Sequence, residues 1–262
     1  MVRFHSPLTL SVVEGMKNNK YQKRFYRHWV NTADLMRSHI VIEETDLEIL
    51  TDRPLKKYWL KKRILGLRQD IKNYIAKDRR FLTSLKPIAV ELDAPIIIKQ
   101  MAQAAYLANV GPMAAVAGCI AQLLAQGLTK LGYGQVIIEN GGDIFLSKQK
   151  KNRLVAIFAG DSKFSGKLNL LIRRNLTPCG ICTSSGTVGH SLSFGNADSV
   201  VIKAKDSALA DAVATATCNL VKSREDFNQA IEFARKIRGV SGVLIILGDY
   251  LASWGDIEIN FS

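Results

Sequence analysis

The stretch from Ser207 to Val221, SALADAVATATCNLV, constrains the fold most, because it has the composition of a helix without a charged face. Asp211 is its single charged residue, and apolar or small residues occur on every side. A helix of this kind is normally buried all round. We therefore predict a central helix over these residues, with Asp211 inside the fold.

Asp211 and Thr215 are spaced i and i+4, which places their oxygen atoms side by side on one face of this helix. A buried carboxylate is costly unless it meets hydrogen-bond donors, a positive charge or a metal ion. Carboxylate and hydroxyl oxygens suit a hard cation such as Mg²⁺. Donation from loop amides, or capping of a neighbouring helix, would satisfy Asp211 equally well, and the spacing leaves these alternatives open.

The polar segment 178–191, PCGICTSSGTVGHS, precedes this helix and is interpreted as a loop. It gathers hydroxyls (Thr183, Ser184, Ser185, Thr187, Ser191), glycines (Gly180, Gly186, Gly189) and His190. Amides, hydroxyls and glycines together suit a phosphate or pyrophosphate group. With the predicted cation at Asp211, the pattern indicates a phosphorylated ligand bound through a divalent ion.

Asn140, Gly141 and Gly142 separate two apolar runs and predict a tight hairpin turn over 139–147. Glu139 and Asp143 flank this turn, and its glycines would let a ligand approach the backbone closely. A second hairpin is expected through KQKKN (148–152). These patterns favour a largely antiparallel sheet.

The N-terminal third carries most of the excess positive charge. Residues 1–86 hold 19 of the 36 Lys and Arg but only 9 of the 23 Asp and Glu. We expect a loose arm over 1–20, strands over 24–30 and 38–52, and a basic helical segment over 55–85. Clustered basic residues can attract nucleic acid, an anionic cofactor or an acidic protein. No recognised nucleic-acid motif accompanies them, so nucleic-acid binding is not favoured over a solvated helix face.

The run from Met113 to Leu131 is the most apolar long stretch, but polar residues such as Gln122, Gln126 and Lys130 interrupt it. This pattern favours a core helix over a membrane span. Pro112 marks its start, and the free amides there would face a nearby anion. The sequence contains four cysteines, too few for a disulfide scaffold, and no convincing signal sequence. We expect a cytoplasmic protein.

Other catalytic motifs are only partly matched. The segment 182–186 resembles a nucleophile elbow, but Cys182 replaces its first glycine, so a serine hydrolase using His190 is not favoured. Cys179 and Cys182 form a single C-x-x-C without the further ligands of a zinc site. The sequence lacks the glycine fingerprints of Rossmann and P-loop nucleotide sites.

Four longer stretches occur in a characteristic order: VGPMAAVAG, ENGGDIF, GICTSSGTVGHSLSFGNAD and ALADAVATA. In these stretches the chain resembles the ApbE family of FAD:protein FMN transferases, and more closely a cytoplasmic, poorly characterised ApbE-like branch. The resemblance extends over roughly residues 21–260. It implies an α+β fold of mainly antiparallel sheets packed with central helices, with 21–262 as one domain made of a basic part (21–86) and a core (87–262).

The resemblance also implies a function: binding of FAD, use of Mg²⁺, and transfer of FMN to a hydroxyl of an acceptor protein with release of AMP. Asp211 and Thr215 match the family's metal ligands, and His190 and Asp211 are the candidates for proton handling. The implied flavin-binding residues are Asn140, Gly141, Gly142, Asp143, Thr183, Ser184, Ser185 and Gly186.

Two stretches depart from the transferase pattern. GHSLSFGNAD keeps His190 but has no D-P-x-T-G, and Gly111-Pro112-Met113-Ala114 replaces a lysine-bearing helix start. Three functions follow as hypotheses: Mg²⁺-dependent flavin chemistry with FMN transfer as its specific form, non-catalytic binding of flavin or another phosphorylated ligand beside a redox enzyme, and a basic binding module. Oligomeric state is left open by the sequence.

Overall fold

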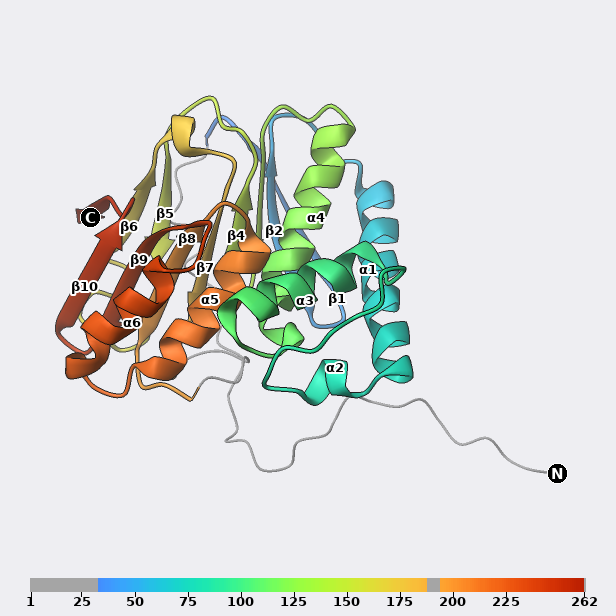
Figure 1. The fold of residues 1–262 in the computed structure, drawn as a ribbon. Coiled ribbons are helices and arrows are strands. Elements are labelled where there is room, and N and C mark those ends of the chain that lie inside the picture. The colour runs from blue at the N-terminus through green and yellow to red at the C-terminus, as the bar shows by residue number, and fades with distance from the viewer. Residues whose placement is uncertain (1–32, 188–193, 262) are drawn as a thin grey trace.

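The computed structural model describes residues 33–187 and 194–261. Their secondary structure forms three layers: helices, a large sheet and a small sheet (Figure 1). The expected arm over 1–20, the expected strand over 24–30 and His190 lie outside the described residues.

The large sheet has eight strands in the order β1-β2-β3-β4-β7-β8-β9-β10, and every neighbouring pair is antiparallel. Its strands are β1 (Met36–Ile42), β2 (Thr45–Thr51), β3 (Val136–Asn140), β4 (Asp143–Leu146), β7 (Cys179–Ser184), β8 (Ser199–Ala204), β9 (Val240–Leu247) and β10 (Tyr250–Gly255). The hairpin expected within 38–52 is present as β1 and β2, and the glycine turn joins β3 to β4.

The small sheet consists of β5 (Arg153–Ile157), β6 (Leu168–Ile172) and β11 (Ile259–Phe261), in the order β11-β6-β5. Residues of alternating position, such as Val155, Ile157, Leu168 and Leu170, pack against one face of the large sheet in a second core. Strand alternation explains this, because side chains at i and i+2 share a face.

The helices cover the opposite face of the large sheet and form the main core (Figure 1). They are α1 (Lys57–Lys77), α2 (Arg80–Thr83), α3 (Ile96–Ala108), α4 (Val116–Lys130), α5 (Ser207–Leu220) and α6 (Phe227–Arg235), with short 3₁₀ turns η2 (Pro112–Ala115), η3 (Arg174–Leu176) and η4 (Arg224–Asp226). The α+β fold class predicted from the sequence is therefore confirmed.

The predicted central helix is present as α5, and its first twelve residues are buried except for Asp211, which is only partly exposed. The helix contacts α3, α4, β7 and β8, so little of its surface meets solvent and it has no charged face. The run Pro112–Lys130 is long and apolar enough to cross a membrane by length and composition alone. Most of it is buried inside the fold, which agrees with the prediction of a core helix.

Two expectations about strands were wrong. KQKKN does not turn a hairpin, because β4 pairs with β3 and β7, while β5 leaves for the small sheet and pairs with β6. The segment 178–191 is not a loop from its start, because residues 179–184 form β7 between β4 and β8. Polar and small residues here form a central strand because both neighbours supply backbone hydrogen bonds.

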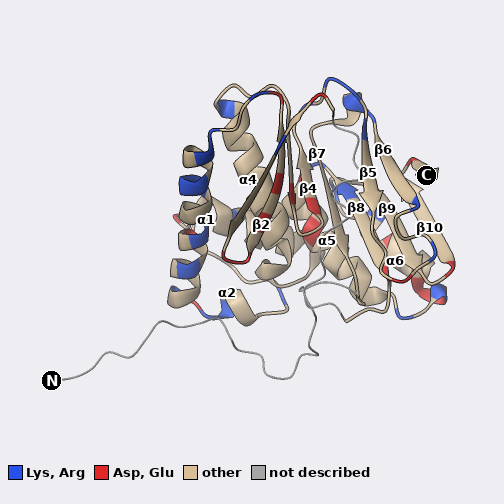
Figure 2. Ribbon diagram, turned by 180° about the vertical axis from the view of Figure 1, so that it is seen from behind, with Lys and Arg blue, Asp and Glu red and all other residues tan. Residues whose placement is uncertain are grey.

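Lys and Arg residues recur along α1 (Figure 2). Part of this charge is paired within the fold: Arg68 bonds Glu43 and Glu44 in the β1–β2 turn, and Lys72 lies 2.7 Å from Glu43. The basic segment therefore contributes to packing of α1 against the first hairpin.

Candidate functional site

Asp211 meets the first turn of α4. Its Oδ2 accepts a hydrogen bond from the Gly118 amide at 2.9 Å, and the Ala117 amide also favours the charged carboxylate. Amides at a helix start lack partners within their helix and carry partial positive charge. The sequence predicted donation to an anion from a helix beginning near Pro112. The α-helix begins instead at Val116, after the 3₁₀ turn, and the amides that reach Asp211 are those of Ala117 and Gly118.

Gly118 is required by this close contact between α4 and α5. A Cβ atom at this position would lie 2.2 Å from the Ser207 carbonyl oxygen and 2.9 Å from the Asp211 Cβ. In addition, the Ser207 hydroxyl donates to the Gly118 carbonyl at 2.7 Å. The two helices are therefore held together at the level of Asp211.

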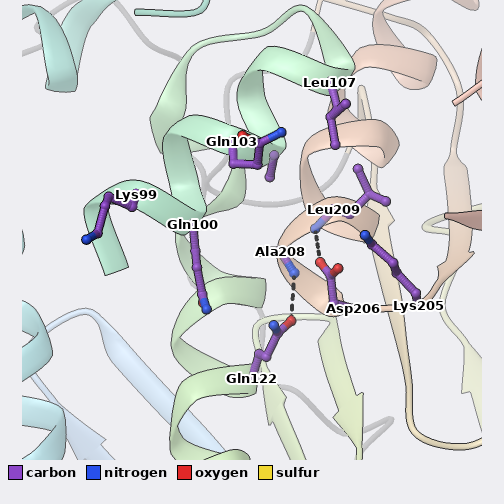
Figure 3. A pocket seen from close by; sticks show the side chains of 10 residues that line it. Lys99, Gln100, Gln103, Leu107, Gln122, Lys205, Asp206, Ala208 and Leu209 are labelled. Atoms are coloured by element: carbon purple, nitrogen blue, oxygen red, sulfur yellow. Dashed lines mark hydrogen bonds between the residues drawn. The ribbon is translucent and has the colours of Figure 1, made fainter. Parts of the chain in front are cut away.

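The first turn of α5 is fixed by two side chains (Figure 3). Asp206 caps the helix, because its Oδ1 accepts from the Leu209 amide at 2.8 Å. Gln122 of α4 accepts from the amides of Ser207 at 2.9 Å and Ala208 at 3.4 Å. These bonds set the position of Asp211 one turn further along α5.

Asp206 and Gln122 also line a pocket of about 310 Å³ between α3, α4 and α5 (Figure 3). Lys99, Gln100 and Lys205 contribute polar groups to it, and Ala104 and Leu209 contribute apolar surface. None of the predicted site residues that the structure describes lines this pocket. We therefore treat it as separate from the Asp211 site.

The glycine turn brings Asp143 to the helix side of the sheet. Gly141 and Gly142 have φ values of 70° and 103°, conformations that glycine adopts readily. The Glu139 carboxylate accepts from the Gly142 amide at 2.8 Å, and Asn140 Nδ2 donates to the Ala117 carbonyl at 3.1 Å. The turn is thereby attached to the start of α4, beside the residues that hold Asp211.

Asp143 is buried, with 7% of its surface exposed, and it lies against the Cys182 thiol and the Thr183 amide. Its pKa is raised well above the usual value by burial and by the negative charges of Asp211 and Glu139. Burial also raises the pKa of Asp211 to about 7, against the opposing effect of the Gly118 and Ala117 amides. The site thus holds two carboxylates that repel each other.

Of the predicted phosphate-binding hydroxyls, Ser184 is buried with 6% exposed, and Thr183 is partly exposed beside Gly142. Ser185 and Gly186 follow the strand, where Ser185 accepts from the Thr187 amide at 3.1 Å and Gly186 donates to the Ala197 carbonyl at 2.9 Å. Thr215 is buried on α5, one turn beyond Asp211. The structure thus brings Asp143 beside Asp211 and Thr183, whereas Ser185 bonds the nearby Thr187 amide and Gly186 bonds Ala197.

The cysteines lie inside the fold as free thiols. All four are free and buried. Burial raises the pKa of the Cys179 thiol to about 11 and raises those of Cys119 and Cys182 further. Neutral thiols are poor nucleophiles and poor metal ligands. The arrangement disfavours the dithiol and zinc alternatives.

The donor set around Asp211 suits a hard cation. Asp143 Oδ1 and Ser184 Oγ are buried and have no hydrogen-bond partner in the part of the chain that the structure describes. Within the same residues, no three His, Cys, Asp or Glu side chains form a metal-binding group. A cation here would therefore need hydroxyl, carbonyl, water or phosphate oxygens beside the carboxylates, as Mg²⁺ commonly does.

Sequence reasoning did not identify the Ala117 and Gly118 amides or Gln122 as parts of the site. The small residues of VGPMAAVAG are the signal that could have indicated such close helix contact, because only small side chains let two backbones approach.

The comparisons with known proteins agree along most of the chain. The family model described as AbpE bacteria matches residues 27–258. A UPF0280 protein of Methanocaldococcus jannaschii is 42% identical over 228 residues, covering 84% of this chain and 91% of that protein. A UPF0280 protein of Methanothermobacter thermautotrophicus is 40% identical over 233 residues, covering 87% of this chain and 88% of that protein.

Among solved structures, the flavin transferase ApbE of Vibrio cholerae has a TM-score of 0.57 at 15% identity, covering 84% of this chain and 97% of that chain. The apo form of the flavinyl transferase ApbE of Pseudomonas stutzeri also has a TM-score of 0.57, at 13% identity, covering 84% and 94%. At these identities the likeness shows a shared fold.

Proposed function

This chain belongs to the family described as AbpE bacteria, and on that premise we propose that it binds a flavin nucleotide with Mg²⁺ and transfers FMN from FAD to an acceptor protein. Family membership, the ApbE fold and the chemistry of the Asp211 site support the proposal together. The acceptor would be a serine or threonine hydroxyl of another protein.

The observation that carries the proposal is the convergence of three elements on one buried acidic site. The start of α4 supplies amides, α5 supplies Asp211 and Thr215, and the β3–β4 turn supplies Asp143. The buried Oδ1 of Asp143 has no hydrogen-bond partner among the described residues, and such an oxygen is costly without a positive partner, which supports a cation at this place.

In the proposed roles, Asp211 and Thr215 hold the Mg²⁺, which would neutralise the pyrophosphate charge during transfer. The turn residues Asn140, Gly141, Gly142 and Asp143 and the segment 183–186 bind the flavin nucleotide. The acceptor oxygen forms a bond to the FMN phosphorus, the bond from that phosphorus to the AMP oxygen breaks, and AMP leaves with the electron pair. His190 or Asp211 takes the hydroxyl proton.

The test is calorimetric titration of FAD into the full chain with and without Mg²⁺, with AMP measured in the same sample. Mg²⁺-dependent binding with AMP release is the expected result when an acceptor is present, and Asp211→Ala should abolish it. Absence of FAD binding at sub-millimolar concentration would contradict the proposal.

One observation favours a second function, binding of flavin or another phosphorylated ligand without catalysis. The lysine-bearing helix start of the transferases is replaced here by Gly111 and Pro112, and a Cβ at Gly111 would lie 1.7 Å from the Ser84 carbonyl oxygen. This position is filled by protein packing. A binding protein would retain FAD without releasing AMP in the same titration.

We further propose a cytoplasmic location and one ApbE-like domain over 21–262, in line with the sequence expectations. An acceptor protein or a partner redox enzyme is the expected macromolecular partner. Nucleic acid is not expected to bind, because part of the basic charge of α1 is paired with Glu43 and Glu44.

A further inference from the structure

Asp143 is the most buried carboxylate beside the proposed cation, and its environment is unusual for a charged group. Its side chain is 7% exposed, and Oδ1 has no hydrogen-bond partner among the described residues. The groups that face it are the Cys182 thiol and the Thr183 amide. The thiol is a weak donor and the amide is a single donor, so one of the two carboxylate oxygens, Oδ1, is left without a hydrogen bond.

The charges that act most strongly on Asp143 are acidic. Asp211 is the first of them and Glu139 the second. A carboxylate in such a position is destabilised both by the lost hydration and by the neighbouring negative charges. A cation shared with Asp211 would replace the lost hydration of Asp143 and would neutralise the repulsion between the two carboxylates.

The alternation of side chains along β4 places Asp143 on the face of the large sheet that the helices cover, where Asp211 also lies. Phe145 lies two residues further along β4 and belongs to the core beneath the helices, whereas Ile144 packs on the core of the small sheet. Asp143 therefore shares the helix face with Phe145. Cys182 also lies on this face, since its thiol is 3.3 Å from the Ser207 carbonyl oxygen of α5.

Asp211 lies beside the same place. Its Oδ2 accepts from the Gly118 amide at 2.9 Å, the Ala117 amide also favours the charged carboxylate, and the side chain remains partly exposed. The carboxylates of β4 and α5 then lie near each other, close enough for the charge of Asp211 to act on Asp143. Divalent cations commonly bind such pairs through one oxygen of each.

We propose that Asp143 is a direct ligand of the divalent cation held by Asp211 and Thr215, so that the cation joins strand β4 to helix α5. This inference rests on the proposed function, which assigns the cation only to α5. Asp143 would then bind the ion rather than the flavin nucleotide that the resemblance assigns to it.

Mn²⁺ binding to the full chain without nucleotide tests the proposal, by calorimetry and by the electron paramagnetic resonance signal of the free ion. Asp143→Asn should weaken Mn²⁺ binding by at least about ten-fold. Loss of a residue that only hydrogen-bonds a metal ligand already weakens metal affinity by about ten-fold or more, and loss of a direct ligand should cost at least as much. Asp161→Asn, at an exposed position, is the matched control and should bind as the wild type does. Equal Mn²⁺ affinity in Asp143→Asn and the wild type, or no Mn²⁺ binding by the wild type, would overturn it.

A second measurement uses the unaltered chain, in case Asp143→Asn does not fold. Fe²⁺ with ascorbate and peroxide cleaves the backbone close to the bound ion. Cleavage near both 143 and 211, suppressed by excess Mg²⁺, is expected. Cleavage near 211 alone would refute a ligand on β4.

The outcomes separate this inference from the proposed function. Asp143-dependent Mn²⁺ binding without any FAD binding would retain the cation site and remove the flavin chemistry. Mg²⁺-dependent AMP release with Mn²⁺ affinity unchanged in Asp143→Asn would retain the function and remove Asp143 as a ligand.

Discussion

The Asp211 carboxylate and the Gly118 amide are joined by a hydrogen bond of 2.9 Å across the contact between α5 and α4. This bond fixes the acidic group at the positive end of a neighbouring helix. It also requires that residue 118 has no side chain, because the Ser207 carbonyl oxygen would lie 2.2 Å from a Cβ there. The geometry of the site and the packing of its two helices therefore depend on the same glycine.

Gly118→Ala should separate α4 from α5 and lower the free energy of unfolding by about 1–3 kcal/mol, as overpacking of a core does. Cation binding should weaken at the same time, because Asp211 moves away from the amides. Urea unfolding and Mn²⁺ titration measure the two effects.

Gly66→Ala is the control for this substitution. Gly66 lies within α1, and a Cβ there meets no atom within 4 Å. Alanine is the better helix former by about 1 kcal/mol, so this variant should be slightly more stable than the wild type. If both alanine variants are more stable than the wild type, the contact between α4 and α5 has room for a side chain at residue 118, which contradicts the prediction.

Gln122→Leu should destabilise the first turn of α5, because it removes the oxygen that accepts from the Ser207 and Ala208 amides. Each buried amide left without a partner costs about 1–3 kcal/mol. Gln126→Leu, one turn further along α4 and exposed, should leave the urea midpoint unchanged. Equal midpoints for the two variants would show that the Gln122 bonds do not hold α5.

Local sequence patterns predicted much of the fold because they reflect local physics. The absence of a charged face from 207 to 221 predicted a buried α5, and Asn140-Gly141-Gly142 predicted the β3–β4 turn. Both depend on side chains within the segment itself.

Strand partners could not be predicted in the same way. The chain distance from β4 to β7 is long, and KQKKN has the composition of an ordinary turn, so nothing local shows that β5 joins the small sheet. The segment 178–191 was interpreted as a loop because it is rich in hydroxyl residues and glycines. One of these glycines is Gly180, whose missing side chain is required by the approach of α5, because a Cβ would lie 2.4 Å from the Ser207 Cα. The same residue that weakens the strand pattern makes the packing possible.

The candidate site was only partly accessible from the sequence. Asp211 and Thr215 follow from helical spacing, but the proximity of Asp143 to Asp211 depends on how β4 is placed under α5. The backbone amides of α4 carry no side-chain signal at all.

Arg68→Met should lower the free energy of unfolding by about 1–2 kcal/mol, although Arg68 lies in a segment with the appearance of a simple basic patch. Its guanidinium bonds Glu43, Glu44 and the buried Thr45 hydroxyl, the last at 2.7 Å. Because Glu43 and Glu44 are well exposed, most of the loss should come from Thr45. Lys61→Met, on the exposed face of α1, is the control and should have no effect in urea unfolding. Equal stability of the two variants would show that the hydrogen bonds of Arg68 do not stabilise the fold.

The stability of the metal-free protein should fall as pH rises from about 4 to about 7. Burial raises the pKa of Asp211 from 3.8 in the unfolded chain to about 7 in the folded protein, so the folded state binds a proton more tightly. The stabilisation is fully present below pH 3.8 and is lost as pH rises through the folded-state pKa.

Thermal unfolding in the presence of a chelator measures this loss of stability. Asp211→Asn should flatten the dependence between pH 4 and 7, whereas Asp161→Asn should not. Saturating Mg²⁺ should restore stability near pH 8 in the wild type and not in Asp211→Asn, because the ion binds the carboxylate that the proton has left. A wild-type profile that rises between pH 4 and 7, with no difference from Asp211→Asn, would show that this carboxylate is not held in the desolvated site.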